Sequence, residues 1–271
     1  MGSFYDFEPE DNLATTRDSK IDEAKKALLS FFEQHPKDTF YEHQIEVIFE
    51  KTFFHWITGK ALHELDAERK IASDLLPLIG DVQIRLYRRK SHVNWRRQAK
   101  EIIQLVRAFS TEDFARGLGH HGEQMFDAAL PRAGFLPLGR NVKSVDGKDW
   151  KDSGHDLDRV FIREGVRYGV EIKNRLSYMD FAEIQIKTRM CQFFEVIPLF
   201  IVRMFPKSYF DYVYERGGIS LIFEYQLYPH GQHQLAREVR QKLRLPVDCP
   251  ASIYDGTLTR LLKAIAGRKR T

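Results

Sequence analysis

The sequence has few cysteines and no long apolar run. Only Cys191 and Cys249 occur among 271 residues, too few for a disulfide framework and typical of a reducing compartment. The longest apolar run, residues 196–202, is far shorter than the roughly 20 residues that a membrane helix needs. The N-terminus lacks the basic start and apolar stretch of a secretory signal. We therefore expect a cytoplasmic protein with no membrane partner.

Several common functional motifs are also missing. No Walker A lysine loop or dinucleotide glycine fingerprint occurs, so the sequence gives no support for ATP-driven or redox chemistry. His120, His121 and His155 lack the Cys-x-x-Cys or His-Glu-x-x-His spacing of a zinc site. With 43% apolar residues, 17 glycines and 10 prolines, the chain has the composition of a globular protein.

The net charge of +4 is distributed unevenly. Residues 1–16 contain four acidic and no basic residues, which predicts a disordered acidic tail. Residues 85–107 contain eight basic residues and one acidic residue, with Tyr87 and Trp95 among them. Such a segment suits a surface that binds nucleic-acid phosphates. The predicted nucleic-acid-binding residues are Lys60, Arg85, Arg88, Arg89, Lys90, Arg96, Arg97 and Lys100.

Apolar periodicity before residue 112 predicts three helices, a hairpin and a fourth helix. Helices are expected over 20–35 and 42–53, and a third one is expected to be capped by Thr58. Strands 70–78 and 82–88 meet at a turn of Gly80 and Asp81, and Asn94 caps a basic helix that ends near 109. This order is typical of a winged helix and predicts a nucleic-acid-binding domain over 17–112. A winged helix that contacts protein remains an alternative.

The rest of the chain, 113–271, predicts an α/β domain whose sheet is flanked by helices. We place the domain boundary within the polar stretch 110–119. Expected helices are 122–133, 179–195, 206–215 and 233–243. Expected strands are 156–162, 166–173, 197–205 and 218–228, with a weaker one over 142–151.

One predicted hairpin brings acidic residues together. A two-residue turn of Glu164 and Gly165 gives a register in which Asp158 lies opposite Glu171. Directly opposed residues have Cβ atoms about 5 Å apart. Lys173 shares their face because strand side chains alternate with period two. The other face is apolar and consists of Leu157, Phe161, Tyr168, Val170 and Ile172.

Two adjacent carboxylates repel each other unless a cation lies between them. Mg²⁺ suits this pair, since it prefers oxygen ligands and takes one or two carboxylates together with substrate phosphate. Such an ion activates water and stabilises charge on phosphate oxygens, while Lys173 orients the nucleophile or holds a phosphate. The pattern predicts phosphodiester hydrolysis with Mg²⁺, for which Mn²⁺ would substitute.

Asp158 followed by Glu171, Ile172 and Lys173 resembles the PD-(D/E)XK nuclease superfamily, which includes restriction endonucleases and Holliday-junction resolvases. Leu157 stands where the motif has proline. The resemblance covers roughly residues 111–228 and implies a restriction-endonuclease-like mixed sheet flanked by helices. It also implies that Asp158, Glu171 and the Ile172 carbonyl bind the metal.

Further site residues follow from this resemblance and from the strand pattern. Glu123, on an earlier helix, is implied to contact metal-bound water. Asp156 has the same facing as Asp158, so either acid can be the metal ligand, with Asp158 favoured. Gln185, on the helix 179–195, is a candidate helper, and His155 is a candidate phosphate contact.

The sequence therefore predicts a Mg²⁺-dependent DNA endonuclease with a winged helix that holds DNA. A homodimer would fit staggered cuts in both strands. Two alternatives stay open. One is a DNA-binding regulator with an inactive nuclease fold, and the other is an assembly protein in which the two acids and the lysine form a salt bridge.

Overall fold

The computed structural model describes residues 18–268, so the predicted acidic tail lies outside the described residues. The chain divides into two compact units. The N-terminal unit comprises the described residues up to Leu75 together with Arg85–Trp95, and the C-terminal unit comprises Leu76–Ile84 and the described residues from Arg96. None of the helices within 18–268 is long and apolar enough to cross a membrane.

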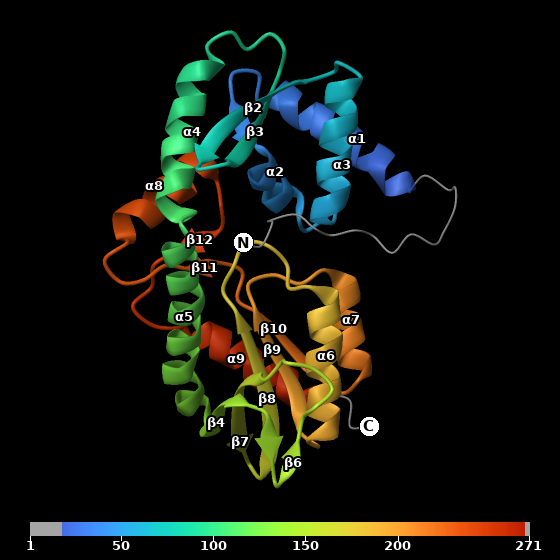
Figure 1. Cartoon of the computed structure of the whole chain (residues 1–271), viewed down its shortest axis with the longest axis vertical. Coiled ribbons are helices and arrows are strands. Elements are labelled where there is room, and N and C mark those ends of the chain that lie inside the picture. Colours follow the sequence, from blue (N-terminus) through green and yellow to red (C-terminus); the bar gives the residue numbers. More distant parts are fainter. Residues whose placement is uncertain (1–17, 269–271) are drawn as a thin grey trace. The chain divides into compact units, whose positions relative to one another are not determined.

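The first part of the chain forms three helices and a three-stranded sheet (Figure 1). Its core contains Leu28, Phe32, Ile45 and Leu62, each 0–1% exposed. In the sheet, β3 lies between β1 and β2, and β1 pairs with β3 in antiparallel fashion. The elements are α1 (Ser19–Gln34), β1 (Thr39–Tyr41), α2 (Glu42–Phe49), α3 (His55–Ala67), β2 (Ala72–Ile79) and β3 (Val82–Arg88).

Most of the individual helices and strands predicted for this region are confirmed. The hairpin strands end and begin on either side of Gly80, whose φ of 53° suits glycine. The helix cap predicted at Thr58 is wrong, because α3 begins at His55 and Thr58 is fully buried inside it. Strand β1 is only three residues long and shows no period that would reveal it.

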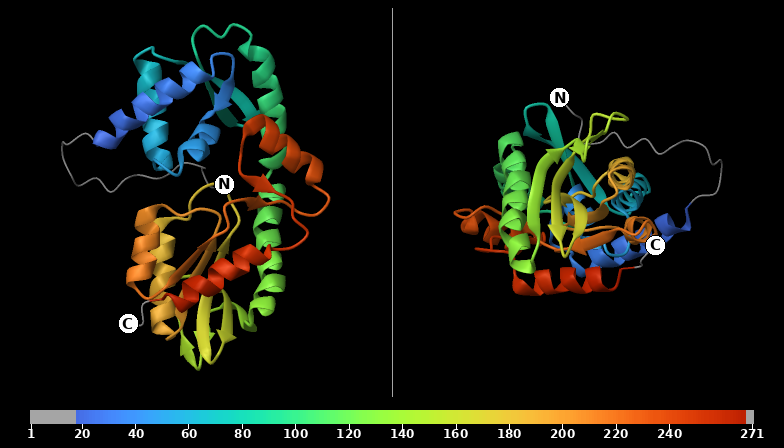
Figure 2. Two further views of the ribbon diagram at one scale, coloured as in Figure 1. Left: turned by 180° about the vertical axis from the view of Figure 1, so that it is seen from behind. Right: turned by 90° about the horizontal axis from the view of Figure 1, so that it is seen from below.

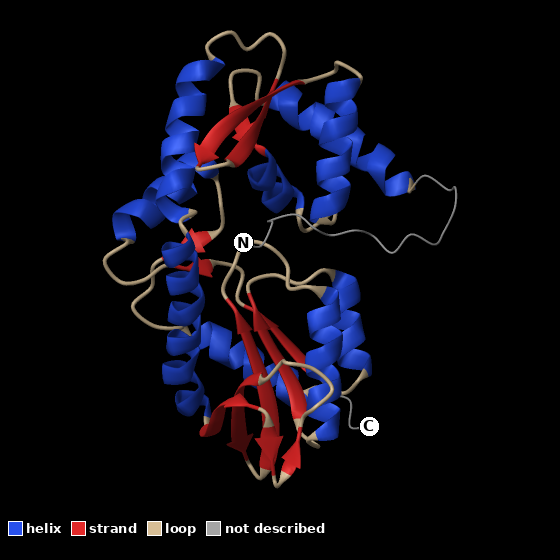
Figure 3. Ribbon diagram, in the orientation of Figure 1, coloured by secondary structure: helices blue, strands red, loops and turns tan. Residues whose placement is uncertain are grey.

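The C-terminal unit contains a mixed five-stranded sheet in the order β10-β9-β8-β7-β4 (Figure 3). Strands β8, β9 and β10 run parallel, while β7 is antiparallel to β8 and β4. Its strands are β4 (Leu136–Val142), β7 (Leu157–Arg163), β8 (Val166–Lys173), β9 (Ile197–Val202) and β10 (Ile219–Ile222). Shorter strands are β5 (Ser144–Val145), β6 (Lys148–Asp149), β11 (Gln226–Leu227) and β12 (Val247–Asp248).

Helices cover both faces of this sheet. On one face, Phe126 of α5 and Leu258 and Leu261 of α9 pack against apolar strand residues, and Figure 2 shows α9 lying across the strands. On the other face, α6 contributes Ile184, Met190 and Cys191, and α7 contributes Val213. The helices from residue 95 onward are α4 (Trp95–Phe109), α5 (Glu112–Ala129), α6 (Phe181–Phe193), α7 (Lys207–Glu215), α8 (His233–Leu243) and α9 (Asp255–Ala266), with a 3₁₀ turn over Leu130–Ala133.

Several predicted elements of this unit need correction. The helix predicted over 122–133 begins ten residues earlier, at Glu112, so α5 includes Gly117 and Gly119, and the Thr111 side chain caps it. The weak strand over 142–151 is instead the pair β5 and β6. The strand predicted over 218–228 is interrupted at Glu224, which has φ of 73°. Both β4 and α9 were missed.

Helix α6 approaches strand β8 closely at Gly169. A Cβ atom at this position would lie 2.6 Å from Sγ of Cys191 and 2.9 Å from Cδ1 of Leu157. These distances are too short for any real contact, so a larger residue would push α6 away from the sheet. Leu157 packs on this side with Val160, which corrects its predicted place on the opposite face.

We expect Gly169→Ala to lower the free energy of unfolding by about 1–3 kcal/mol, because it overpacks the contact between α6 and β8. Gly117→Ala is the matched control. Gly117 lies in a helix with nothing near its missing Cβ, so this change should raise stability by about 0.5–1 kcal/mol. Urea unfolding of both variants measures the difference, and equal stabilities would contradict the proposed close contact.

Candidate functional site

The hairpin of β7 and β8 has the predicted register. Arg159 lies opposite Val170 and Arg163 opposite Val166. The turn residue Glu164 has φ of 51° and is followed by Gly165 with φ of 77°, the left-handed pair of a two-residue hairpin turn. The predicted face-to-face placement of the two acidic residues depends on this register.

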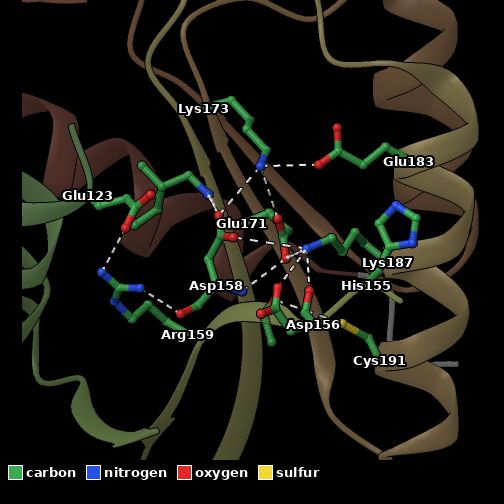
Figure 4. A network of polar contacts seen from close by, with 12 residues as sticks. Glu123, His155, Asp156, Asp158, Arg159, Glu171, Lys173, Glu183, Lys187 and Cys191 are labelled. Carbon is green, nitrogen blue, oxygen red and sulfur yellow. Dashed lines mark hydrogen bonds and ion pairs between the residues drawn. The ribbon is translucent and has the colours of Figure 1, made fainter. Parts of the chain in front are cut away.

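At the end of the hairpin beyond the pair of Arg159 and Val170, side-chain carboxylates accept hydrogen bonds from backbone N–H groups of the two strands. The N–H of Asp158 donates to Oε1 of Glu171 at 3.1 Å. The N–H of Ile172 donates to Oδ2 of Asp158, also at 3.1 Å. These two bonds hold each carboxylate against the neighbouring strand, so both acids are fixed at one edge of the hairpin (Figure 4).

Lys173 faces three carboxylates, as the strand alternation predicts for two of them. Its Nζ lies 3.7 Å from Oδ2 of Asp158 and 3.6 Å from Oε2 of Glu171. The third carboxylate belongs to Glu183 of α6, with Oε1 at 3.1 Å. Burial lowers the pKa of Lys173, but the three carboxylates outweigh it and raise this pKa, so the side chain stays charged.

A second lysine, Lys187 of α6, reaches the same carboxylates from the helix side (Figure 4). Its Nζ donates to Oε1 of Glu171 at 2.7 Å and also to the backbone carbonyl of Asp156. Oδ1 of Asp158 lies 4.0 Å away. Lys187 is only 3% exposed, so its charge is compensated by these acids rather than by water.

Glu171 is the most perturbed acid of the site. It is 1% exposed, and burial together with the nearby Asp158 raises its pKa to about 8, although Lys187 and Lys173 lower it in part. Its Oε2 atom is buried and accepts no hydrogen bond among the described residues. The ammonium of Lys173, 3.6 Å away, neutralises part of its charge, but a buried oxygen without a hydrogen bond favours a further cation or donor.

The charges of the cluster fit a divalent cation. Four carboxyl groups, those of Asp156, Asp158, Glu171 and Glu183, surround the ammonium groups of two lysines. With all four ionised, the cluster has a formal net charge of −2. Asp158 and Glu171 offer hard oxygen ligands of the kind that Mg²⁺ prefers. We therefore judge that these residues fit the expected metal.

Glu123, which the resemblance implies to contact metal-bound water, pairs with an arginine of β7. It lies on α5 and its Oε2 accepts from Nη2 of Arg159 at 3.0 Å. Asp127, one turn later, accepts from Nε of the same arginine at 2.8 Å. Arg159 also donates to the backbone carbonyl of Asp158 at 2.6 Å. Glu123 thus supports the strand that carries Asp158 through a buried arginine.

The other predicted residues lie at varied positions around the cluster. Asp156 precedes β7, and its Oδ1 is 3.9 Å from Nζ of Lys187. His155 is half-buried, and its Nδ1 lies 3.1 Å from Oγ of Ser153. Gln185 is on α6, half-buried. The α6 residues that reach the cluster are Glu183, which pairs with Lys173, and Lys187, which pairs with the carboxylates; they lie on either side of Gln185.

Lys187 was missed in the sequence, although its position on α6 contained a signal for a buried charge. Ile184, Lys187, Thr188 and Cys191 form the buried stripe of α6, at the spacing of an apolar helix face. A lysine in such a stripe is unusual and indicates a buried acidic partner. Glu183 lies four residues before Lys187, so both side chains point toward the same strands.

The predicted nucleic-acid-binding residues differ in exposure. Two are held within the protein. Arg88 pairs with Asp74 and lies 4.0 Å over the Trp95 ring, and Nη1 of Arg85 donates to Oγ of Ser73 at 3.3 Å. Arg89 is half-buried. The exposed members are Lys60, Lys90, Arg96, Arg97 and Lys100.

No family model, curated protein or solved structure matches this chain. Only the geometry and chemistry of the site therefore bear on its function.

Replacing Lys187 tests whether its ammonium group stabilises the ionised form of Glu171. When folding raises the pKa of a carboxyl group, the free energy of unfolding falls as the pH rises from the pKa in the unfolded chain to the pKa in the folded protein. In Lys187→Met the pKa of Glu171 in the folded protein should lie above 8. The free energy of unfolding of the variant should therefore continue to fall above pH 8, where that of the native protein no longer depends on Glu171. The difference should be small at pH 6 and grow above pH 8, by at most about 1.4 kcal/mol per pH unit.

Urea unfolding in EDTA between pH 6 and pH 9 measures this difference. The control is Lys207→Met, since Lys207 forms an exposed ion pair with Asp211 and should matter by less than about 0.5 kcal/mol at every pH in this range. A Lys187→Met protein whose stability follows the native protein at all pH values would show that the pair has no such role.

Proposed function

We propose that this chain is a Mg²⁺-dependent endodeoxyribonuclease of the PD-(D/E)XK type. The observation that carries the proposal is the joint placement of Asp158, Glu171 and Lys173 at one edge of the β7–β8 hairpin. The mixed sheet with helices on both faces supports the restriction-endonuclease-like assignment.

Asp158, Glu171 and the backbone carbonyl of Ile172 are the proposed metal-binding groups. A bound Mg²⁺ would supply Lewis-acid stabilisation of charge on the phosphate. Lys173 is the proposed catalytic lysine, which orients the attacking water or binds a phosphate oxygen. Glu183 and Lys187 are positioning residues, because each contacts a proposed catalytic side chain from α6.

The N-terminal region is proposed to be a winged helix that binds DNA. The element order α1, β1, α2, α3, β2, β3 and the sheet order β1-β3-β2 support this assignment. Glu64 of α3 and Glu68, just after it, contact Lys25 of α1, and His63 of α3 contacts Glu42. Since these side chains already have protein partners, we propose that DNA is held through its phosphates. The domain limits 17–112 and 113–271 stay a prediction.

A second candidate function is a DNA-binding regulator without cleavage activity. The contact between Lys187 and Glu171 favours it, because a lysine ammonium at 2.7 Å already compensates part of the charge that a metal ion would neutralise. The two candidates differ in one measurable property, which is metal-dependent hydrolysis of DNA.

Substitution of the proposed catalytic residues provides the direct test. We expect Glu171→Gln and Lys173→Ala to reduce Mg²⁺-dependent cleavage by at least about 100-fold, since each removes a group that stabilises the transition state. DNA affinity measured in EDTA should change little. The rate is measured on linear, nicked, flapped and four-way DNA, which also identifies the substrate structure.

The control for cleavage is Lys207→Ala, an exposed lysine on α7, which should cleave at the native rate. Native-like cleavage by both Glu171→Gln and Lys173→Ala would refute the assignment. Tight DNA binding by the native protein, with no cleavage in Mg²⁺ or Mn²⁺, would favour the regulator.

The exposed basic residues of α4 test the proposed phosphate contacts. Replacing Arg96, Arg97 and Lys100 by alanine should weaken DNA binding to a similar extent for all sequences. It should also reduce the slope of log affinity against log salt by about 0.9 for each phosphate that the variant no longer neutralises. Fluorescence anisotropy at several salt concentrations measures this slope.

The matched control is Lys207→Ala combined with Lys263→Ala, two exposed lysines elsewhere in the C-terminal unit. An unchanged salt slope in the triple variant would remove α4 from the DNA-binding surface while leaving the proposed active site untouched.

A further inference from the structure

Three side chains of metal-ligating type converge in the N-terminal unit. His43 and Glu46 are three residues apart on α2 and share one face of this helix, while His55 is the first residue of α3. One ligand atom from each side chain lies within 4.8 Å of the other two. Within residues 18–268, no other group of three His, Cys, Asp or Glu side chains meets this condition.

The contacts within this group place nitrogen and oxygen atoms side by side. Nδ1 of His43 lies 2.8 Å from Oε2 of Glu46. The rings of His43 and His55 have centroids 5.4 Å apart and stand nearly perpendicular, at 84°. Glu50, just after α2, brings Oε2 to 3.5 Å from Nε2 of His55. A carboxylate beside an imidazole is the usual outer partner that orients a metal-binding histidine.

Glu46 brings a buried negative charge into this group. It is 5% exposed, and in the described part of the chain its one ion-pair partner is His43. A carboxylate removed from water costs free energy unless a cation is close. A metal ion held between Glu46 and the two imidazoles would supply the missing positive charge.

The helix that faces Glu46 leaves room for its carboxylate. Gly59 of α3 has no side chain, and a Cβ atom there would lie 3.1 Å from Oε1 of Glu46. Any larger residue at Gly59 would therefore press on the carboxylate. Gly59 thus allows α3 to pack closely against the carboxylate of Glu46.

We propose that His43, Glu46 and His55 bind one Zn²⁺ ion that joins α2 to α3. Two imidazoles and a carboxylate suit zinc, whereas Mg²⁺ prefers oxygen ligands alone. Zinc lies about 2.0–2.2 Å from such atoms, so small side-chain rotations bring the three ligands into place. Three protein ligands leave a fourth position for water or another ligand. This site is independent of the proposed nuclease centre.

Calorimetric titration of the full chain with Zn²⁺, in excess Mg²⁺ to saturate any oxygen-ligand site, tests the proposal. We expect one Zn²⁺ per chain and a rise in melting temperature upon binding. His43→Asn and Glu46→Gln should each weaken Zn²⁺ binding by at least about 100-fold, the upper end of what loss of an outer partner costs. His43 is partly exposed, so its replacement leaves the apolar core intact.

The control is His63→Asn, an exposed histidine of α3, which should bind Zn²⁺ as the native protein does. Circular dichroism without metal verifies that each variant folds. Absence of stoichiometric Zn²⁺ binding, or equal affinity in the native, His43→Asn and Glu46→Gln proteins, would overturn the proposal. Loss of Zn²⁺ binding in Glu171→Gln but not in His43→Asn would assign the ion to the other site and equally overturn it.

Discussion

The ionisation of one buried carboxyl group, that of Glu171, sets the requirements for much of the C-terminal unit. A buried carboxylate is costly unless charge and hydrogen bonds compensate it. Here the backbone of Asp158 and the ammonium of Lys187 both reach Oε1, while Oε2 accepts no hydrogen bond from the described residues. The compensation is incomplete, and the pKa of about 8 reflects this.

The packing of α6 against the sheet brings Lys187 to Glu171 and so provides part of the charge compensation. Gly169 allows Cys191 to approach the sheet, and Lys187 lies one helical turn before Cys191. The lysine therefore reaches the carboxylates only because a small residue occupies the strand. On the opposite side of β7, Arg159 links Glu123 and Asp127 to the backbone carbonyl of Asp158. Helices on both faces thus hold the short segment that carries the acids.

Two kinds of metal chemistry are proposed for two separate units. The C-terminal cluster offers carboxylate oxygens and two lysines, which suits a hard ion and a phosphate substrate. The N-terminal cluster offers imidazole nitrogens of His43 and His55 with one carboxylate, which suits zinc. Because their ligand types differ, the two centres would discriminate between ions without competing for one.

Local rules were sufficient for the β7–β8 hairpin. The turn at Gly165 and the period-two alternation of strands fix which residues lie opposite one another, so the grouping of Asp158, Glu171 and Lys173 follows from the sequence. Most helices and central strands were found in the same way. The start of α5 was missed because its first half is polar and contains glycines, and β4 was missed because its residues are largely exposed.

The contacts that complete the two clusters depend on distances between elements that are remote along the chain. Lys187 meets Glu171 only through the approach of α6 to β8, and Glu123 meets Arg159 only because α5 packs on the sheet. His55 likewise meets Glu46 through the packing of α3 on α2. Periodicity reports which side of an element is buried, but the partner on that side is set by the packing of the whole unit.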